Sequence, residues 1–195
     1  MERDEPIVRD LDPNDVAGVR QAAAVLAAAL PNAWPTLTEA TAEVWEALAP
    51  GRVCLAAWRG GALVGWVGGI PDYSHAWELH PLVVRADARG QGVGRALVAA
   101  LEQRARAAGA LTLYLGTDDD WAEPRTSVGG VDLWSDPLAQ AAALEPGSHP
   151  AGFYRRVGFA VVGVLPDANG PGKPDIWMAK RLGPAPADGN PPPSG

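Results

Sequence analysis

The sequence predicts a single α/β domain with a mixed central β-sheet and helices on both of its faces. Three observations predict this fold: two apolar runs joined by a glycine pair, an amphipathic helix between two further apolar runs, and two short strands near the end of the chain. The 195 residues, 47% hydrophobic and 20% charged, have the length and composition of one globular domain rather than of a disordered chain.

The first predicted element is a helix over residues 16–30. Apolar side chains from Val16 to Leu30 recur every three or four positions, Asn14 or Asp12 can cap the start, and Pro31 stops the pattern.

A second helix is predicted to begin at a Thr38 cap. It carries Val44, Trp45 and Leu48 inward, and the Pro-Gly pair at 50–51 ends it.

A hairpin follows these helices. Residues 52–59 and 62–70 are apolar and favour strands, and Gly60-Gly61 is the kind of two-residue link that closes hairpins. A third strand over 76–84 is interrupted by Pro81, which cannot donate to a ladder and therefore predicts a bulge or a strand that parts from its neighbour.

The next predicted unit is a strand, a glycine-rich turn, a helix and a strand. Apolar residues from Val93 to Ala108 have helical spacing, Gly109 ends the run, and residues 111–115 form a buried-type strand. The two strands of such a unit should be parallel.

The remainder of the chain is predicted to hold a long functional loop and two strands. Residues 116–150 are rich in turn formers and acids, with a helix near 137–144, and a short helix over 150–157 precedes strands at 159–165 and 175–181. The domain is expected to span residues 1–182, followed by a Pro/Gly-rich disordered tail over 183–195.

Charge and cysteine content limit the possible partners. The 16 basic and 23 acidic residues give a net charge of −7, which argues against nucleic acid or an anionic membrane as partner. The single Cys54 excludes an internal disulfide and a multi-thiolate metal site, and no metal is expected. The chain shows no signal-like stretch and no long apolar run, so we expect a cytoplasmic protein.

A glycine turn precedes the predicted helix at Val93. Its backbone N–H groups and those of the first helical turn favour a phosphate ligand. A dinucleotide fingerprint starting at Gly90 would end on Arg95 instead of glycine, and the Gly-Lys-Ser/Thr of a P-loop is absent, which disfavours both of those classes.

The pattern Arg-x-x-Gly-x-Gly, formed by Arg89, Gly92 and Gly94, resembles the GNAT superfamily of acetyl-CoA-dependent N-acetyltransferases. Longer blocks resemble its aminoglycoside 6'-N-acetyltransferases: Glu-Leu-His-Pro-Leu-Val-Val at 78–84, Leu-Gly-Thr-Asp-Asp at 115–119, His-Pro-x-x-Phe-Tyr at 149–154, Val-Gly-Val-Leu-Pro-Asp-Ala-Asn-Gly at 162–170 and Lys-Pro-Asp-Ile-Trp-Met-Ala-Lys at 173–180. These blocks cover most of residues 76–181, whereas the N-terminal third matches loosely.

The resemblance implies a GNAT fold with acetyl-CoA as co-substrate. The turn would hold the pyrophosphate of coenzyme A, and residues 85–109, with five arginines against Asp87 and Glu102, have a local charge of +3 that agrees with this. The implied acetyl-CoA contacts are Leu82, Val83, Val84, Arg89, Gly90, Gln91, Gly92, Val93, Gly94 and Arg95. Backbone N–H groups of 82–84 are expected to be free of the ladder after the bulge, and Leu82 to act on the thioester oxygen.

Glu78 and His80 stand two apart on one strand and therefore share a face. By resemblance, Glu78 positions the acceptor ammonium group and removes its proton, with His80 beside it, and Tyr154 is the proton donor or hydrogen-bond partner of the coenzyme thiolate. No covalent acetyl-enzyme is expected, because Cys54 lies in an apolar run and the transfer can be direct in a ternary complex.

The acceptor is expected to be cationic. Residues 116–136 carry six acids and one base, a local charge of −5 that favours polycations. The expected acceptor contacts are Trp34, Tyr73, Glu78, Asp118, Asp119 and Asp120, and Trp121 is an additional candidate wall.

The predicted activity is acetyl transfer to the 6'-amino group of aminoglycoside antibiotics, which would confer resistance. Two alternatives stay open at this stage: a GNAT enzyme for another cationic amine, such as a polyamine or a protein amino terminus, and a non-catalytic module that binds acyl-CoA or the drug. A homodimer through the strand at 175–181 is also expected.

Overall fold

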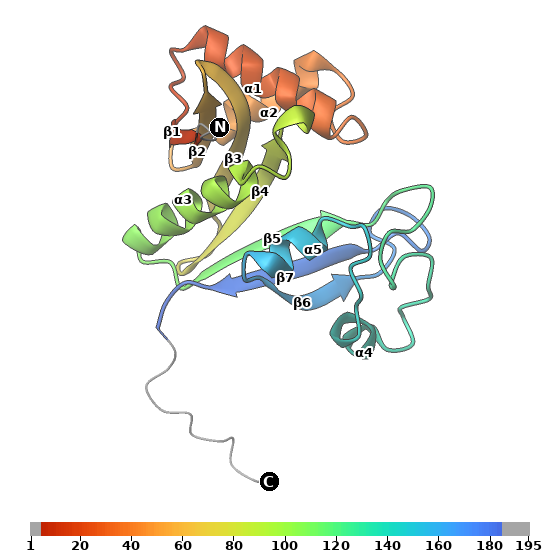
Figure 1. Ribbon diagram of the computed structural model, residues 1–195. Helices are drawn as coiled ribbons and strands as arrows, with labels where there is room; N and C mark the ends of the chain where they lie inside the picture. The colour runs from red at the N-terminus through yellow and green to blue at the C-terminus, as the bar shows by residue number, and fades with distance from the viewer. Residues whose placement is uncertain (1–4, 185–195) are drawn as a thin grey trace.

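The computed structural model describes residues 5–184 (Figure 1). Its strands are β1 (Ile7–Asp10), β2 (Val53–Arg59), β3 (Ala62–Pro71), β4 (Ala76–Val84), β5 (Thr112–Asp118), β6 (Ala160–Leu165) and β7 (Asp175–Arg181). Its helices are α1 (Val16–Ala29), α2 (Leu37–Ala47), α3 (Val93–Ala107), α4 (Pro137–Ala142) and α5 (Ala151–Arg156), with a 3₁₀ turn η1 at Ala86–Ala88. Most of the tail predicted for 183–195 lies outside the described residues, so the domain boundary at 182 stays a prediction.

The strands form one mixed sheet in the order β1-β2-β3-β4-β5-β7-β6. All neighbouring pairs are antiparallel except β4 and β5, which are parallel as the strand-helix-strand pattern predicts. Figure 1 shows α1 and α2 grouped at the β1–β4 half, with α3 crossing that half and α5 lying over the β5–β7–β6 half.

The first helix begins with a different cap from the one expected. Asp15, and not Asn14 or Asp12, accepts a hydrogen bond from Gly18 N at 2.9 Å. Asp12 instead accepts from Asn14 N in the turn before the helix. The sequence places three capping side chains within four positions, and pattern alone does not separate them.

The second helix also begins earlier than expected, at a Thr36 cap. Thr36 and Glu39 form a reciprocal capping box, which a Thr38 cap could not make. Val44 is fully buried, as predicted, but Trp45 is 47% exposed, because neighbouring helical positions point about 100° apart and cannot both face the core.

The β2–β3 hairpin is confirmed. Gly60 and Gly61 both have positive φ, 56° and 79°, the conformation that a two-residue hairpin turn requires and that glycine adopts without strain. The short edge strand β1 pairs with β2 and was not predicted, because its largely exposed residues show no apolar alternation.

Two hydrophobic cores lie on opposite faces of the sheet. One packs α3 and α5 against the sheet and includes Trp77, Leu79 and Tyr154, whereas the other packs α1 and α2 against β2–β4. Cys54 belongs to the second core, and its burial raises the pKa of the thiol to about 12. The thiol is therefore protonated near neutral pH, which agrees with the expected inert role.

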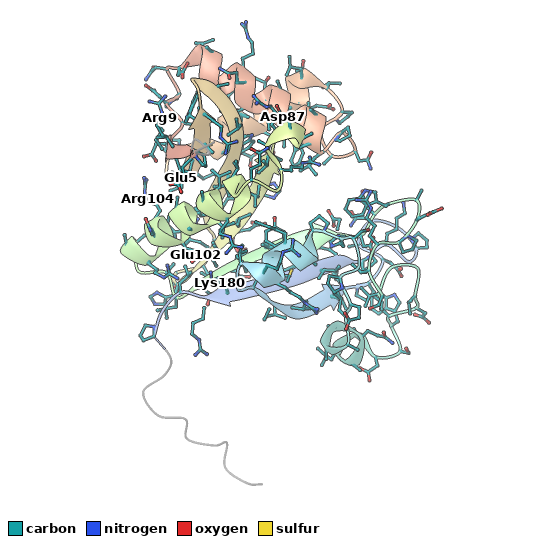
Figure 2. All side chains as sticks on the ribbon, viewed as in Figure 1. Glu5, Arg9, Asp87, Glu102, Arg104 and Lys180 are labelled. Carbon is teal, nitrogen blue, oxygen red and sulfur yellow. The ribbon has the colours of Figure 1, made fainter. Side chains whose placement is uncertain are left out.

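An ionic cluster around the buried Glu102 links the two halves of the sheet on the α3 face (Figure 2). Lys180 Nζ on β7 donates to Glu102 on α3 at 2.5 Å and to the Val157 carbonyl just after α5 at 2.7 Å. Arg106 donates to the same glutamate at 3.1 Å. This cluster joins the elements on either side of the β4–β5 pair.

In the part of the chain that the structure describes, no helix is long and apolar enough to cross a membrane.

Candidate active site

The centre of the candidate site is the point where β4 and β5 separate. The two strands pair only over residues 76–78 and 112–114, so pairing ends where Glu78 meets Tyr114. Figure 1 shows β4 and β5 diverging. Beyond this point the register between β3 and β4 also shifts, because Gly68 faces both His80 and Pro81. The bulge that Pro81 predicted is therefore present, and β5 does not pair with β4 after it.

The bulge reverses the side-chain alternation of β4. Before it, Trp77 and Leu79 face the α3 and α5 core. After it, Leu82 and Val84 pack against that core, and Val83 joins the core under α1 and α2. One extra residue moves every later side chain to the opposite face.

Successive backbone N–H groups of β4 point alternately toward β3 and away from it. Those that point away lie on the edge of β4 that β5 leaves unpaired. Arg85 N donates to the Val64 carbonyl at 2.9 Å. Hydrogen-bonded pairs alternate along an antiparallel ladder, so Val83 bonds to β3 and the N–H groups of Leu82 and Val84 point away from it. The expectation that the Val83 N–H is free of the ladder is therefore wrong, whereas Leu82 and Val84 meet it.

The glycine turn leads directly into α3. Gly90 and Gly92 have φ values of 71° and 87°, and Gly92 is the residue that caps the helix. The N–H groups of Val93, Gly94 and Arg95 belong to the first helical turn, where N–H groups have no intrahelical acceptor. The turn thus presents a row of backbone donors to an anion.

Two side chains of the turn are used to hold its shape. Arg89 Nε donates to the Val84 carbonyl at 3.1 Å, which places the guanidinium beside the bulged strand. Gln91 donates to the Asp87 carbonyl and accepts from Arg59, both at 2.6 Å. The side chain of Gln91 therefore anchors the turn to η1 and β2, and a ligand contact there falls to its backbone.

The turn, β4 and α5 meet at Gly94. A Cβ atom at this position would lie 3.2 Å from the Phe153 ring and 3.7 Å from Val84, so the three elements are in close contact around this glycine. The anion-binding turn and the helix that carries Tyr154 are consequently side by side at the end of the bulged strand.

Glu78 and His80 share one face of β4, as predicted. They project on the side of α1 and α2, opposite to Trp77 and Leu79. The structure also brings Trp34 to this face, with its ring 6.0 Å from that of His80. Glu43 on α2, which the sequence did not single out, lies 3.7 Å from His80 Nε2.

Tyr114 and Asp72 are a second pair that sequence reasoning missed. The Tyr114 hydroxyl donates to Asp72 at 2.7 Å, and its ring lies 6.1 Å from that of the predicted acceptor residue Tyr73. Partial burial, the bond to Asp72 and the charge of Glu78 raise the pKa of Tyr114. A polar aromatic residue in an otherwise aliphatic strand was the available signal for this position.

Tyr154 lies in the core behind the turn. It is 8% exposed and packs edge-on against Phe153 and Phe159. Burial raises the pKa of its hydroxyl, so the group is protonated near neutral pH and is able to donate. None of the hydrogen bonds among residues 5–184 involves this hydroxyl.

The acidic loop after β5 is organised by Asp119, which is only 1% exposed. Its carboxylate accepts from Arg125 N at 3.0 Å, from Thr126 N at 2.8 Å and from the Thr126 hydroxyl at 2.7 Å. The expectation that Asp119 contacts the acceptor is therefore corrected: its carboxylate is directed into the loop, where it satisfies buried donors.

Asp118 and Asp120 keep the exposure that acceptor contacts require. Asp118 is exposed at the end of β5, accepts from Asn169 at 2.5 Å and is in register with Asp175. Burial and the charge of Asp118 raise the pKa of Asp175. Asp118 is four residues beyond Tyr114, about 13 Å along the strand, so it is separate from Glu78, which is in register with Tyr114.

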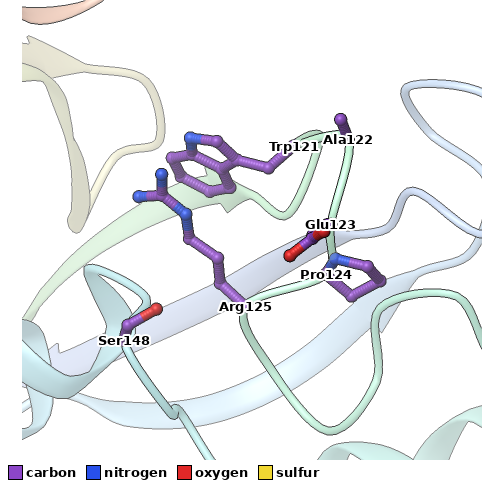
Figure 3. Close-up of a pocket in the computed structure, with 6 residues that line it drawn as sticks. All are labelled: Trp121, Ala122, Glu123, Pro124, Arg125 and Ser148. Carbon is purple, nitrogen blue, oxygen red and sulfur yellow. The ribbon is translucent and has the colours of Figure 1, made fainter.

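The ring of Trp121 contacts two neighbouring side chains. Arg125 lies over the ring at 4.0 Å (Figure 3). His149 packs edge-on against the ring at 5.2 Å. Trp121 and Arg125 line an open hollow of about 320 Å³ together with residues 122–124 and Ser148. The hollow is far along the loop from Glu78, and we assign it no ligand.

We expect Asp119→Ala to lower the free energy of unfolding by about 1.5–3 kcal/mol, because buried donors to a charged acceptor would lose their partner. Urea unfolding measures the change, and faster limited proteolysis within residues 119–128 would locate it. Glu145→Ala, an exposed acid of the same connection, serves as control. An unfolding free energy equal to that of the unchanged chain would contradict the role given to Asp119.

The fold and this site define the class of the protein. The chain belongs to the GNAT family of acetyltransferases, whose family profile matches residues 20–125. This family uses acetyl-CoA. The described residues fit that co-substrate, because the donors of the glycine turn suit its pyrophosphate and the unpaired edge of β4 can bind its amide-rich arm.

Solved structures narrow the comparison to one kind of acetyltransferase. An aminoglycoside 6'-N-acetyltransferase complexed with coenzyme A is 38% identical and covers 92% of this chain and 99% of its own, with a TM-score of 0.85. The aminoglycoside 6'-N-acetyltransferase from Enterococcus faecium is also 38% identical over the same shares, with a TM-score of 0.83. An aminoglycoside 6'-acetyltransferase type Ii is 36% identical over the same shares, with a TM-score of 0.73. The comparison with curated proteins gives no match.

Proposed function

We propose that this chain transfers the acetyl group of acetyl-CoA to the 6'-amino group of aminoglycosides and thereby confers resistance to them. The observation that carries the proposal is the position of Glu78, on the acceptor face of β4 at the residue where β5 stops pairing. Identity of 36–38% to three aminoglycoside 6'-acetyltransferases, each covered over 99% of its length, supports the choice of acceptor.

The transfer is direct, in a ternary complex. The neutral amine attacks the thioester carbon, a C–N bond forms, and the C–S bond breaks. Glu78 takes the proton of the ammonium group, directly or through water, with His80 beside it. The Leu82 N–H, which points away from β3, stabilises the negative charge that develops on the thioester oxygen. Tyr154 donates a hydrogen bond or a proton to the departing thiolate, and the second proton that the nitrogen loses as the amide forms balances the proton that the thiolate gains.

Acetyl-CoA, the acetyl donor, is bound by backbone groups more than by side chains. We assign the pyrophosphate to the N–H groups of residues 90–95, with Arg89 and Arg95 supplying charge, and the pantetheine arm to the edge at Leu82 and Val84. The acceptor is assigned to Trp34, Tyr73 and Glu78 on the opposite face, with Asp118 and Asp120 available to outlying ammonium groups.

A panel of closely related aminoglycosides tests the proposal. Kanamycin A and kanamycin B carry an amine at 6', whereas kanamycin C carries a hydroxyl there. We expect acetyl-CoA-dependent release of free coenzyme A with the first two and none with the third. Turnover of spermidine or of peptide amino termini without turnover of any kanamycin would refute it, and binding without turnover would indicate a non-catalytic module.

We expect Tyr154→Phe to lower the rate of acetyl transfer about 10- to 100-fold, because the hydroxyl is removed while the ring keeps its packing on Phe153 and Phe159. Single-turnover kinetics separate this step from product release. Urea unfolding of Tyr154→Phe checks that lost stability is not the cause. A transfer rate equal to that of the unchanged enzyme would remove Tyr154 from the mechanism.

We further propose that the enzyme is a homodimer in the cytoplasm. Exposed apolar side chains on β6 and β7, namely Val162, Leu165 and Trp177, support an interface between two copies. The need for acetyl-CoA and the single reduced cysteine support the compartment. Sedimentation of the intact chain tests the dimer, and a monomer at micromolar concentration would exclude it.

A further inference from the structure

Glu43 on α2 is a carboxylate that the mechanism above does not use. Its side chain is 13% exposed, although it lies on the helix that covers the acceptor face of β4. Its carboxylate faces His80, with Glu43 Oε1 3.7 Å from His80 Nε2. An N–H···O hydrogen bond is at most about 3.2 Å long, so this contact is not a hydrogen bond.

A carboxylate so nearly buried ordinarily has charged or hydrogen-bonding partners. Within residues 5–184, the carboxylates of Glu43 and Glu78 make no hydrogen bond and no ion pair with Lys or Arg. Elsewhere the chain does compensate acids: Glu46, three positions further on α2, pairs with Arg52 at 3.0 Å, and Glu102 accepts from both Lys180 and Arg106. The acceptor face of β4 therefore holds two carboxylates that no Lys or Arg among residues 5–184 pairs with.

The surroundings of Glu43 suit an organic cation. The ring of Trp34 lies 6.0 Å from that of His80, and Trp34 is partly exposed. An indole face attracts ammonium groups and also packs against the C–H face of a sugar ring. Glu43, His80 and Trp34 come from α2, β4 and the connection before α2, and they lie on the same face as Glu78.

We infer that Glu43 binds a second ammonium group of the acceptor while Glu78 handles the amine that reacts. This inference rests on the proposed function and deepens it: the preferred acceptor is at least a dication, with one ammonium group beside Glu78 and another between Glu43 and the Trp34 ring. Glu43 is thus a specificity residue, and the cationic partner that its carboxylate needs comes with the substrate.

The test compares a polycationic with a monocationic acceptor on Glu43→Gln, which keeps the size of the side chain and removes its charge. For kanamycin B we expect the acceptor KM to rise about 10- to 100-fold, as for loss of a hydrogen bond to a charged group. For methyl 6-amino-6-deoxyglucoside, which has one amine, kcat/KM should change less than twofold. The KM for acetyl-CoA and the kcat for kanamycin B should be unchanged.

The control is Glu46→Gln, on the same helix but exposed and paired with Arg52, which should leave all four constants unchanged. Equal losses with both acceptors, a fall in kcat with an unchanged acceptor KM, or no change would each overturn the inference. A fall in kcat alone would mean that Glu43 acts through His80. Melting curves show whether Glu43→Gln is folded. If Glu43→Gln is unfolded, Glu43→Asp, which keeps the charge, replaces it in the test and should retain part of the kanamycin affinity.

The outcome for the unchanged enzyme separates this inference from the proposed function. If the unchanged enzyme turns over kanamycin B and Glu43→Gln has the same acceptor KM, the proposed function stands and the inference fails. If the enzyme turns over spermidine and no kanamycin, the function fails, and the same comparison with spermidine against butylamine decides the inference.

Discussion

Glu78→Gln should lower kcat/KM for kanamycin by about 10²- to 10⁴-fold, the usual contribution of a general base. The amide has the size of the carboxylate but cannot take a proton from the acceptor. Glu78 occupies the last paired position of β4 with β5, so the substitution changes no core contact and the fold should persist. Coenzyme A release at saturating acetyl-CoA measures the loss.

The KM for acetyl-CoA should change little in this variant, because Glu78 and the glycine turn lie on different elements and Glu78 projects from the face away from α3. Glu46→Gln again provides the matched substitution at an exposed position. Undiminished turnover in Glu78→Gln would show that the amine loses its proton elsewhere. Undiminished resistance together with intact drug binding would favour a sequestering module over an enzyme.

Gly68→Ala should destabilise the fold by about 1–3 kcal/mol, the usual cost of overpacking a core, and abolish most of the activity. Gly68 lies opposite the β4 bulge, and a Cβ atom there would collide with the backbone carbonyl of His80. A backbone atom cannot turn aside as a flexible side chain does, so β3 and β4 must separate or the bulge must rearrange. Either response displaces Glu78 and Leu82 relative to each other.

Urea unfolding and kcat/KM, measured on the same preparation, test this prediction. The matched control is Gly152→Ala in α5, where a Cβ atom would meet its nearest neighbours at 3.6 Å, an ordinary contact. The control should be as stable as the unchanged chain or slightly more stable, since alanine favours helices over glycine. A Gly68→Ala protein with unchanged stability and activity would show that the bulge tolerates a side chain.

Elements with local causes could be predicted from the sequence. The β2–β3 hairpin depends on Gly60 and Gly61, α3 on apolar spacing, and the bulge on Pro81, and all three were found. Elements that depend on distant partners could not be predicted. Strand β1 forms because it can pair with the edge of β2, and the sequence of its four residues gives no sign of that pairing.

The site divides in the same way. The strand residues Glu78 and His80 and the glycine turn belong to continuous segments, so their local placement followed from the sequence. The contacts of Glu43 with His80 and of Asp72 with Tyr114 join residues far apart in the chain, and no spacing rule connects them. Asp119 shows the converse error: its acidic neighbourhood indicated a ligand contact, but burial made it a structural acceptor.

The reversal of alternation at the β4 bulge has a consequence for how this enzyme can diversify. One strand presents Glu78 and His80, the proposed acceptor groups, toward α1 and α2 and, beyond the bulge, presents Leu82 and Val84, the proposed contacts of acetyl-CoA, toward α3 and α5. Substitutions in α2 or in the connection before it can therefore retune the drug spectrum without altering the affinity for acetyl-CoA. Selection by a new antibiotic should accumulate changes around residues 34–43 while the glycine turn stays fixed.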